Sequence, residues 1–445
     1  MNARLSALLI AALLAGFLSG SNDVPGATAE SRAYRSYITS AARDGLFIPE
    51  PTGPQQSLPP RPPGWPASLG LGTSDGPGGA EQVQAEGFRF RYQYLAGGVN
   101  TGNGWRTWAP NGAFAENYVE ESVEAGVIPV FSYYMVRQSE PGNSKPEREG
   151  VLANLTSDST MRALFEDLAS FFRSVANSPD PVVLHFEPDL WGFLQQQSQD
   201  DNGATVEVAV TSSQQLDVTG LPDNAAGLAQ AVVALRDRYA PNVLVAFHYS
   251  TWGSGVDPVY TDLSSEQLTK LVDRSVHFYE SLGARFDLAF AEMSDRDAGF
   301  KQFIYGDGGA SWWDESDFST HLELVKKFVT GSQLRVVLWQ IPLGNTRMRS
   351  MNNTWNHFQD NKVEWLLGDS SFDHLRAYVN TGVIGLLFGR GADGATCACD
   401  ASNDGVTNPA PINGNSMVTA SSDDDGGYFA LRAAIFAAAD PLPIP

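Results

Sequence analysis

From residue 65 onward, short apolar runs alternate with segments whose apolar residues recur at helical spacing. The apolar runs cover residues 67–71, 88–95, 127–133, 182–187, 243–249, 286–292, 334–340 and 382–388. Helices are expected at 113–125, 159–175, 225–239, 264–282, 317–329, 360–379 and 428–439, and only the first connection, 76–86, is too short for a long helix. Strands that alternate with helices form parallel sheets, and eight such strands can close a barrel. The sequence therefore predicts the α/β class and, within it, a (β/α)8 TIM barrel with extended βα loops.

An open, doubly wound parallel sheet is the alternative interpretation of the same alternation. Such sheets usually carry a glycine-rich phosphate-binding turn directly after the first strand. Residues 71–79 contain several glycines, but Pro77 lies among them and no clean helix start follows. The barrel is therefore the favoured architecture.

The first 64 residues are interpreted as two segments that precede the barrel. A short basic end is followed by an apolar core too short to span a bilayer, and Ala27-Thr28-Ala29 fits a small-x-small cleavage site. Residues 1–29 are therefore predicted to be a secretory signal peptide, so that the mature protein is secreted or periplasmic. Residues 30–64 become rich in proline and are predicted to be a linker, with residues 65–445 as the barrel domain.

Charge and cysteine content narrow the range of partners. The formal net charge of −22 disfavours nucleic acid and anionic membrane surfaces, so a neutral or cationic substrate fits better. No second long apolar run follows the signal, so we expect no membrane span, and we expect a monomer. The two cysteines, Cys397 and Cys399, lie one residue apart, and in an exported protein they are expected to form a local structural link rather than a redox centre.

The stretch 181–192 carries the strongest functional signal. Its apolar run ends at Glu187 and is followed by Pro188, Asp189 and Trp191. Proline cannot donate to a strand ladder, so the strand is expected to stop there, with Glu187 at its C-terminal tip and Asp189 in the loop beyond. Ligands bind at such tips in parallel α/β proteins. The structural alternative is that Glu187 only caps the following helix or pairs with a charge on it.

The ends of the other predicted strands carry carboxylates, amides and many aromatic rings, with few lysines. Aromatic faces stack on the C–H faces of sugar rings, and carboxylates and amides bind hydroxyl groups. The substrate-binding residues predicted on this basis are Asp75, Tyr94, Trp105, Tyr134, Trp191, His248, Tyr249, Trp252, Asp295, Trp339, Gln340, Asn345 and Arg390. A carbohydrate polymer is therefore the expected partner, and no cofactor is expected.

With an acidic residue at the tip of the fourth strand and this chemistry at the other tips, the chain resembles the (β/α)8-barrel glycoside hydrolases that bacteria secrete. The resemblance runs from about residue 65 to the C-terminus. It assigns no family, because the Asn-Glu pair of a large retaining group is Phe186-Glu187 here and Gln340 stands where that group has its nucleophile. It implies a glycosidase that cleaves O-glycosidic bonds of a neutral or amino-sugar polysaccharide.

Glycoside hydrolysis needs an acid for the leaving oxygen and a base or nucleophile opposite it. Glu187 is predicted to be the acid, because burial beside aromatic rings would raise its pKa. Glu292, at the end of the sixth run, is the first choice of partner, Asp189 is the second, and Asp295 or Asp297 is the third.

Two other functions remain open at this point. Gln340 at the usual nucleophile position keeps a catalytically inactive, carbohydrate-binding barrel as the alternative. A metal-dependent hydrolase is the third interpretation, with His185, Glu187 and His248 as a possible transition-metal site. Metal-dependent barrels of the amidohydrolase type resemble one another in a His-x-His on the first strand, which residues 67–71 lack, so no metal is expected.

Overall fold

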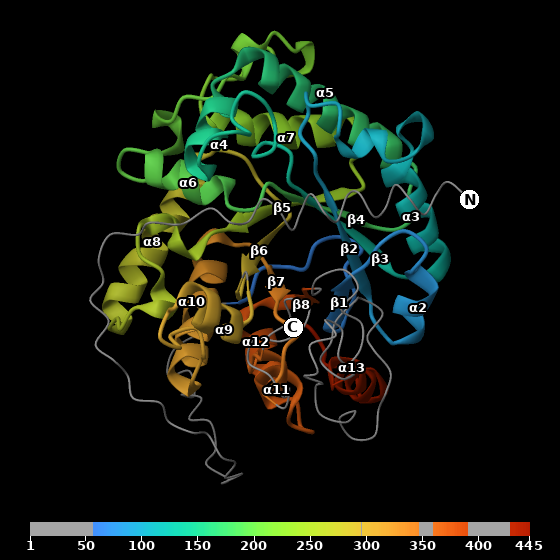
Figure 1. The fold of residues 1–445 in the computed structure, drawn as a ribbon, viewed down its shortest axis with the longest axis vertical. Coiled ribbons are helices and arrows are strands. Elements are labelled where there is room, and N and C mark those ends of the chain that lie inside the picture. Colours follow the sequence, from blue (N-terminus) through green and yellow to red (C-terminus); the bar gives the residue numbers. More distant parts are fainter. Residues whose placement is uncertain (1–56, 295, 347–358, 390–427) are drawn as a thin grey trace.

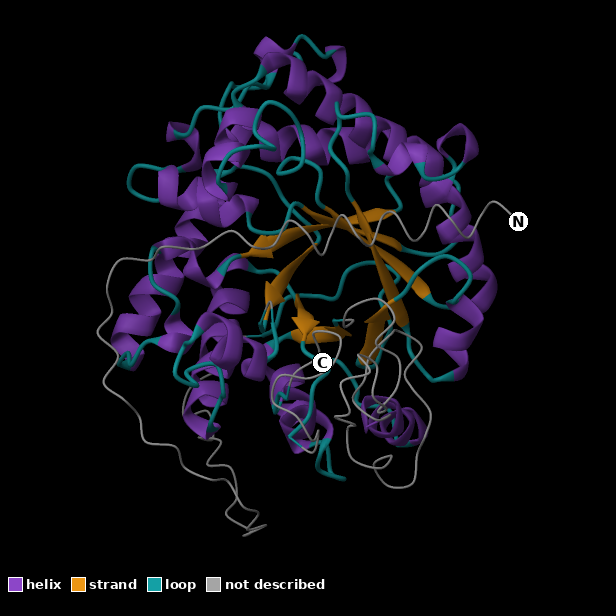
Figure 2. Cartoon of the chain, in the orientation of Figure 1, coloured by secondary structure: helices purple, strands orange, loops and turns teal. Residues whose placement is uncertain are grey.

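The computed structural model describes residues 57–294, 296–346, 359–389 and 428–445. Parallel strands pair in sequence order, and the pairing of the last with the first closes the barrel. The strands are β1 (Gly70–Ser74), β2 (Phe90–Leu95), β3 (Ile128–Tyr133), β4 (Val182–Phe186), β5 (Val243–Tyr249), β6 (Leu288–Glu292), β7 (Val336–Ile341) and β8 (Val383–Phe388). Figure 2 shows them as a ring surrounded by helices, which confirms the predicted (β/α)8 barrel.

The helices cover the outside of this ring (Figure 1), and all but α13, which follows β8, lie between successive strands. They are α2 (Ala80–Ala85), α3 (Phe114–Ala125), α4 (Glu147–Leu155), α5 (Asp158–Val175), α6 (Leu190–Gln197), α7 (Ala225–Tyr239), α8 (Ser265–Ser281), α9 (Ala298–Phe300), α10 (Glu315–Ser332), α11 (Lys362–Leu367), α12 (Asp373–Thr381) and α13 (Tyr428–Ala438). None of the helices among the described residues has the length and apolar character needed to cross a bilayer.

One predicted helix is divided in two. Segment 360–379 forms α11 and α12, with the break at residues 368–372. Phe372 has a φ of 54°, in the left-handed region that interrupts a helix and costs an L-residue about 1–2 kcal/mol. Its ring is buried and packs edge-on against Phe436 of α13, with ring centroids 5.2 Å apart. Burial of this ring offsets the backbone strain and explains why the periodicity is broken here.

Large side chains fill the inside of the barrel. Phe90, Tyr92, Val337 and Trp339 belong to this inner cluster, and Trp65 closes its N-terminal end. The Trp65 ring stacks on Phe90 with centroids 4.9 Å apart, and its Nε1 donates to the carbonyl of residue 384 at 3.0 Å. Since this end is plugged, ligand access to the barrel is expected from the C-terminal ends of the strands.

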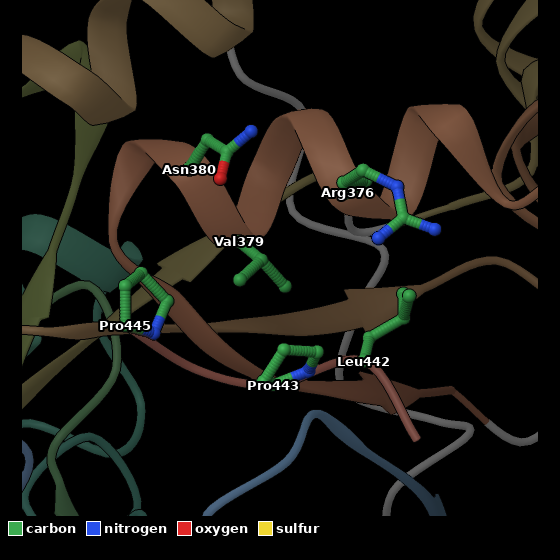
Figure 3. Close-up of a pocket in the computed structure, with 6 residues that line it drawn as sticks. All are labelled: Arg376, Val379, Asn380, Leu442, Pro443 and Pro445. Atoms are coloured by element: carbon green, nitrogen blue, oxygen red, sulfur yellow. The ribbon is translucent and has the colours of Figure 1, made fainter. Parts of the chain in front are cut away.

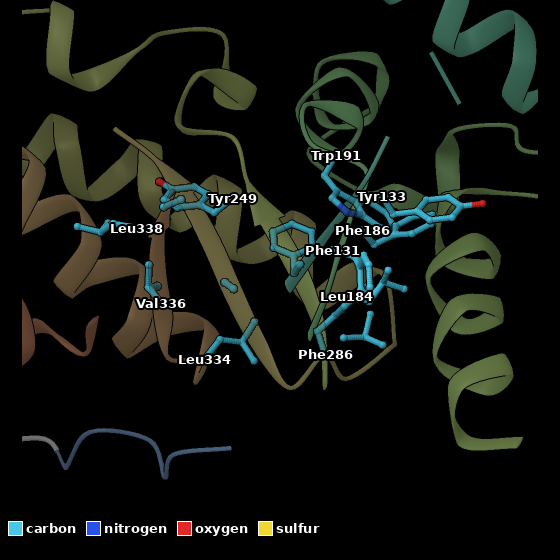
Figure 4. Close-up of a cluster of buried hydrophobic side chains, with 14 of the residues drawn as sticks. Phe131, Tyr133, Leu184, Phe186, Trp191, Tyr249, Phe286, Leu334, Val336 and Leu338 are labelled. Carbon is cyan, nitrogen blue, oxygen red and sulfur yellow. The ribbon is translucent and has the colours of Figure 1, made fainter. Parts of the chain in front are cut away.

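A second apolar layer lies between the strands and the helices, as Figure 4 shows. Side chains alternate along a strand, so the neighbours of inward-facing residues enter this layer. Phe186 stacks with Tyr133 and contacts Trp191. Tyr249 stacks on Phe328 of α10 with ring centroids 3.9 Å apart. This layer attaches the helices to the barrel wall.

The first described residues and the C-terminus meet at the N-terminal end of the barrel. Arg335, which directly precedes β7, donates from Nε to the carbonyl of Pro59 at 2.5 Å and from its guanidinium to that of Pro445. A pocket of about 230 Å³ lies between α12 and the C-terminal segment. Its lining residues, drawn in Figure 3, are Arg376, Val379, Asn380, Leu442, Pro443 and Pro445. Because α12 leads into the start of β8, this pocket lies at the end of the barrel opposite the strand tips.

Candidate functional site

Three side chains converge where β4, β5 and β6 end. Asp189 follows β4, His248 is the penultimate residue of β5, and Glu292 is the last residue of β6. One ring nitrogen of His248 and one oxygen of each carboxylate all lie within 4.8 Å of one another. His248 is fully buried, whereas the two carboxylates are half-buried. We call these three residues the tip cluster.

Strand alternation brings two of these residues to the inner side of the barrel. Ala246 and His248 are two residues apart on β5, and Phe290 and Glu292 are two residues apart on β6. Ala246 and Phe290 belong to the cluster that fills the barrel, so His248 and Glu292 continue the same faces toward the mouth. Glu292 is paired in register with Trp339 of β7.

Asp189 reaches the tip cluster because the backbone turns sharply after β4. Glu187 has a φ of 47° and Asp189 a φ of 67°, on either side of Pro188. Left-handed conformations of non-glycine residues are strained by roughly 1–3 kcal/mol and concentrate at functional sites. Asp189 is the N-cap residue of α6, yet its side chain makes no capping hydrogen bond. Its carboxylate lies beside His248 and Glu292 instead.

Glu187 is held in a different place. Its Oε1 accepts the backbone N–H groups of Met135 and Val136, both at 2.9 Å, in the loop after β3. Its side chain is almost completely buried, and burial raises the pKa of Glu187 to about 8 against the effect of these two hydrogen bonds. The carboxyl group is therefore mostly protonated at neutral pH and holds the β3 loop against the end of β4. It does not cap α6, and the structure groups Glu292 with Asp189 rather than with Glu187.

A hydrogen-bonded pair of histidines runs inward from the tip cluster. His185 Nε2 lies 2.9 Å from His248 Nδ1, and His185 Nδ1 lies 3.2 Å from the Ser132 hydroxyl. All three side chains are fully buried. Burial lowers the pKa of His248 to about 3 and, together with the nearby His248, holds the pKa of His185 well below its usual range. Both imidazoles are thus neutral at neutral pH.

The other ring nitrogen of His248, Nε2, is buried and lacks a hydrogen-bond partner among the described residues. Because Nδ1 is engaged by His185, Nε2 is the nitrogen available to the tip cluster. Buried polar atoms are nearly always paired, so this one indicates a group that binds there.

Aromatic and amide groups from β2 and β7 border the tip cluster. Gln340, which has a φ of 51°, donates from Nε2 to the Tyr94 hydroxyl at 2.5 Å. Burial raises the pKa of Tyr94 well above its usual value, and the charges of Tyr92 and Glu292 contribute. Trp339 packs against Tyr94 and His248 and is almost fully buried, so it supports the site from inside the barrel.

Tyr134 directly follows β3, which is paired with β4 in the barrel. Its hydroxyl donates to Glu147 at 2.9 Å. Its pKa is raised well above the usual value by burial, with the charges of Glu147 and Asp189 contributing. Of the predicted substrate-binding residues, the structure thus brings Tyr94, Tyr134, His248, Trp339 and Gln340 to the tip cluster.

Other predicted substrate-binding residues lie elsewhere. Asp75 forms an ion pair with the buried Arg91 at 3.1 Å, behind the barrel wall. Trp105 is 1% exposed and donates to Asp167 at 2.8 Å. Trp191 and Tyr249 fill the layer between strands and helices, where protein side chains cover their rings. None of these groups faces the tip cluster, because each contributes to the packing of the wall.

Asn345, Trp252 and Asp297 are the remaining predicted residues that the structure describes. Asn345 is completely buried, and Trp252 is half-buried and packs against Phe193 of α6. Asp297, the third-choice carboxylate, is buried, and one of its oxygens accepts the backbone N–H of Gly344 at 3.4 Å. Asp295, Arg390 and the Cys397–Cys399 pair lie outside the described residues, as does the predicted signal peptide.

Two residues of the site are absent from the predicted substrate-binding residues, although His185 was considered as a metal ligand. Ser132 and His185 carry the chain of hydrogen bonds behind His248. Ser132 and His185 each lie two residues before a predicted strand-tip residue, Tyr134 and Glu187, so alternation along a strand predicts that they point to the same face of the sheet as that residue. The two are paired in register on β3 and β4. Period-two alternation was therefore the sequence signal that pointed to them.

No protein-family model matches the chain, and no curated protein matches its sequence. Solved structures with similar folds include a family 39 glycoside hydrolase from the gut symbiont Bacteroides cellulosilyticus WH2, at 12% identity and a TM-score of 0.42, covering 84% of this chain and 64% of that one. A glycoside hydrolase of family 5, subfamily 18, from Streptomyces cattleya in complex with GlcNAc has 14% identity and a TM-score of 0.43, covering 85% of this chain and 82% of that one. A Bacteroidetes-affiliated family 5 cellulase has 13% identity and a TM-score of 0.42, covering 84% and 92%.

These three structures are glycoside hydrolases of families 39 and 5. The barrel itself is shown by its own strand pairing.

Proposed function

We propose that this protein is a secreted, retaining glycoside hydrolase in which Asp189 and Glu292 are the two catalytic carboxylates. The observation that carries the proposal is their spacing, with oxygens within 4.8 Å of each other at the C-terminal mouth of the barrel. Retaining enzymes hold their carboxyl groups roughly 5–5.5 Å apart, whereas inverting enzymes need roughly 6.5–9.5 Å to admit a water. The spacing favours the retaining mechanism.

The surroundings suggest a division of roles. Two carboxylates this close cannot both be ionised cheaply, so one of them keeps a proton. Asp189 lies at the N-terminus of α6, where the helix dipole favours an anion. Glu292 then holds the proton, donates it to the leaving oxygen, and the Asp189 carboxylate attacks the anomeric carbon as the glycosidic bond breaks. Water hydrolyses the glycosyl–Asp189 ester in the second step, with Glu292 as the base.

The substrate class follows from charge and from exposed rings. The net charge of −22 disfavours anionic polymers and leaves neutral or amino sugars. Tyr260, after β5, and Tyr305, after β6, are 39% and 55% exposed. Both follow strands whose tips carry the tip cluster, and exposed rings of this kind stack on sugar faces. We therefore favour a polymer that extends over the β5 and β6 loops.

The test is hydrolysis by purified full-length protein of a panel of neutral and amino-sugar polysaccharides, with the anomer of the first product read by NMR. We expect the configuration of the substrate to be retained. Asp189→Asn and Glu292→Gln are expected to lower kcat/KM by about 10³-fold or more. The matched controls Asp273→Asn and Glu266→Gln, both exposed on α8, are expected to keep activity. Sugar binding without hydrolysis in the wild type would instead establish the inactive, carbohydrate-binding alternative.

Azide distinguishes the two roles. In Asp189→Gly, azide is expected to attack directly and give a glycosyl azide of inverted configuration. In Glu292→Gly, azide attacks the covalent intermediate and gives a product of retained configuration. The opposite pattern would exchange the roles of the two carboxylates.

A further inference from the structure

We propose that the tip cluster also binds a divalent transition-metal cation of the zinc class, with Asp189, His248 and Glu292 as ligands, and that the bound cation blocks hydrolysis. The cation would occupy the same three residues that form the proposed active site. The inhibitory effect rests on that function, but the binding of the cation does not.

The donor set matches such a cation. Imidazole nitrogen and carboxylate oxygen are ordinary zinc ligands, and three protein ligands with an open fourth position are a common arrangement. Metal–ligand bonds of about 2.1 Å place tetrahedral donor atoms roughly 3.4 Å apart. Donor atoms within 4.8 Å of one another therefore need to close by no more than about 1.4 Å. Asp189 and Glu292 are half-buried side chains at strand ends, which can make this adjustment by rotation.

The second, independent observation is the buried imidazole. His248 is fully buried, its Nε2 has no hydrogen-bond partner among the described residues, and this is the nitrogen left after His185 engages Nδ1. Asp189 and Glu292 also interact with other protein groups. Each carboxylate offers two oxygens with several lone-pair directions, so those interactions can persist when a cation binds.

His185 and Ser132 support His248 in the way that hydrogen-bond partners usually support a metal-bound histidine. Such a histidine almost always donates its other ring N–H to a neighbour, which fixes the tautomer. With the cation on Nε2, His248 Nδ1–H donates to His185 Nε2, and His185 Nδ1–H donates to the Ser132 hydroxyl oxygen. The contacts of 2.9 Å and 3.2 Å accommodate this order. Without the cation, a proton on His248 Nε2 would point to the carboxylates. His248 Nδ1 would then accept from His185 Nε2–H, and His185 Nδ1 would accept from the Ser132 hydroxyl. The two states therefore differ in which ring nitrogen of each histidine carries the proton.

The first experiment measures Zn²⁺ binding to metal-free, full-length protein by competition with a chromophoric chelator. We expect one site in the wild type and a loss of affinity of at least 100-fold in His248→Gln. His277→Gln, an exposed histidine on α8, is the matched control and is expected to bind as the wild type does. Because His248 is buried, the half-buried Asp189→Asn provides a second variant with the same expected loss. Equal affinity in the wild type, His248→Gln and Asp189→Asn overturns the proposal.

Spectroscopy adds a readout that a merely structural role would not move. Co²⁺ in place of Zn²⁺ is expected to give the d–d bands of a tetrahedral site with a histidine ligand, and these bands are expected to disappear in His248→Gln. In ¹⁵N NMR, Zn²⁺ is expected to leave the His248 and His185 protons on Nδ1. Protons that remain on Nε2 with Zn²⁺ bound overturn the assignment of His248 as a ligand.

The effect on activity separates this proposal from the proposed function. Zn²⁺ is expected to inhibit polysaccharide hydrolysis over the same concentrations at which it binds, and a chelator to restore activity. Stimulation of hydrolysis by Zn²⁺ overturns the inhibitory role. If metal-free protein cleaves no sugar while Zn²⁺ still binds in a His248-dependent manner, the metal site stands and the glycosidase function fails.

Discussion

The guanidinium of Arg91 lies 3.1 Å from the carboxylate of Asp75 in the wall between the barrel and α3. Arg91 is completely buried, stacks over the ring of Tyr118 with its guanidinium carbon 3.8 Å from the centroid, and also pairs with Glu121. Asp75 thus compensates a buried cation, although its position after β1 predicts a sugar ligand. The two roles have different consequences when Asp75 is changed.

Asp75→Asn is expected to lower the free energy of unfolding by about 2–4 kcal/mol. Removing one partner of a buried pair typically costs about 3–5 kcal/mol, and here Glu121 still compensates part of the Arg91 charge. KM for the polymer is expected to stay unchanged. Urea unfolding and steady-state kinetics of the variant, with Asp273→Asn as the exposed control, check both points. A raised KM with an unchanged free energy of unfolding would instead show that Asp75 binds substrate.

Glu187→Gln is expected to change how stability depends on pH. The pKa of Glu187 is raised from 4.5 to about 8 in the folded protein, so between these values the folded state binds more protons than the unfolded state. The stabilisation is fully present below about pH 4.5 and is lost as pH rises through 8. From pH 5 to pH 8 the wild type should lose about 3–4 kcal/mol that the variant does not lose.

The measurement for Glu187 is urea unfolding of both proteins at pH 5 and pH 8. The difference in the free energy of unfolding between wild type and variant removes the contribution of other titrating groups, which both proteins share. The side-chain carbonyl of the introduced glutamine can still accept the N–H groups of Met135 and Val136, so the variant is expected to fold. Parallel pH profiles for the two proteins would show that Glu187 is ionised in the folded state.

Most of the fold was predictable because apolar runs at barrel strands are long and sharply bounded. Segment 243–249 matches β5 at both ends, and 182–187 exceeds β4 by one residue. The division of 360–379 was not predictable, because its cause is a left-handed Phe372 whose ring is buried by a helix some sixty residues away in sequence. At such positions tertiary packing, rather than the local periodicity of the sequence, determines where a helix ends.

The site was predictable in part. Glu292 and His248 lie at strand tips, as their runs indicated. The direction of the Glu187 side chain depends on a φ of 47°, and a sequence does not encode backbone angles at single residues. The aromatic residues show a related limit: Trp191 and Trp339 both lie near tips, but neither ring is exposed, because one packs outside the barrel wall and the other inside it.

Tyr260→Ala and Tyr305→Ala are expected to raise KM for a long polymer several-fold, and to leave kcat/KM for a small aryl glycoside nearly unchanged. Each tyrosine ends a short helical turn, 258–260 or 301–305, that follows a strand of the tip cluster, and each is exposed enough to stack on a sugar. Pairs of aromatic rings are worth about 0.5–1.5 kcal/mol beyond the area they bury, and we expect a ring–sugar contact to be of similar size. Tyr260→Phe and Tyr305→Phe keep the ring and serve as controls. Equal effects on polymer and aryl glycoside would contradict a role in extended binding.

His321→Gln is expected to make the protein more tolerant of acid. Burial lowers the pKa of His321 to about 3, with the charge of Lys362 contributing, and its Nδ1 lies 2.8 Å from the Tyr378 hydroxyl. In the unfolded chain the histidine takes up a proton near pH 6.5, so between about 6.5 and 3 the unfolded state binds more protons and stability falls with pH. On going from pH 6.5 to pH 4 the wild type should lose up to about 3 kcal/mol through this residue, and the variant should lose that much less. Unfolding midpoints in urea at the two pH values, with the exposed His277→Gln as the control, measure the difference, and a loss of equal size in both variants would mean that His321 takes up its proton in the folded state.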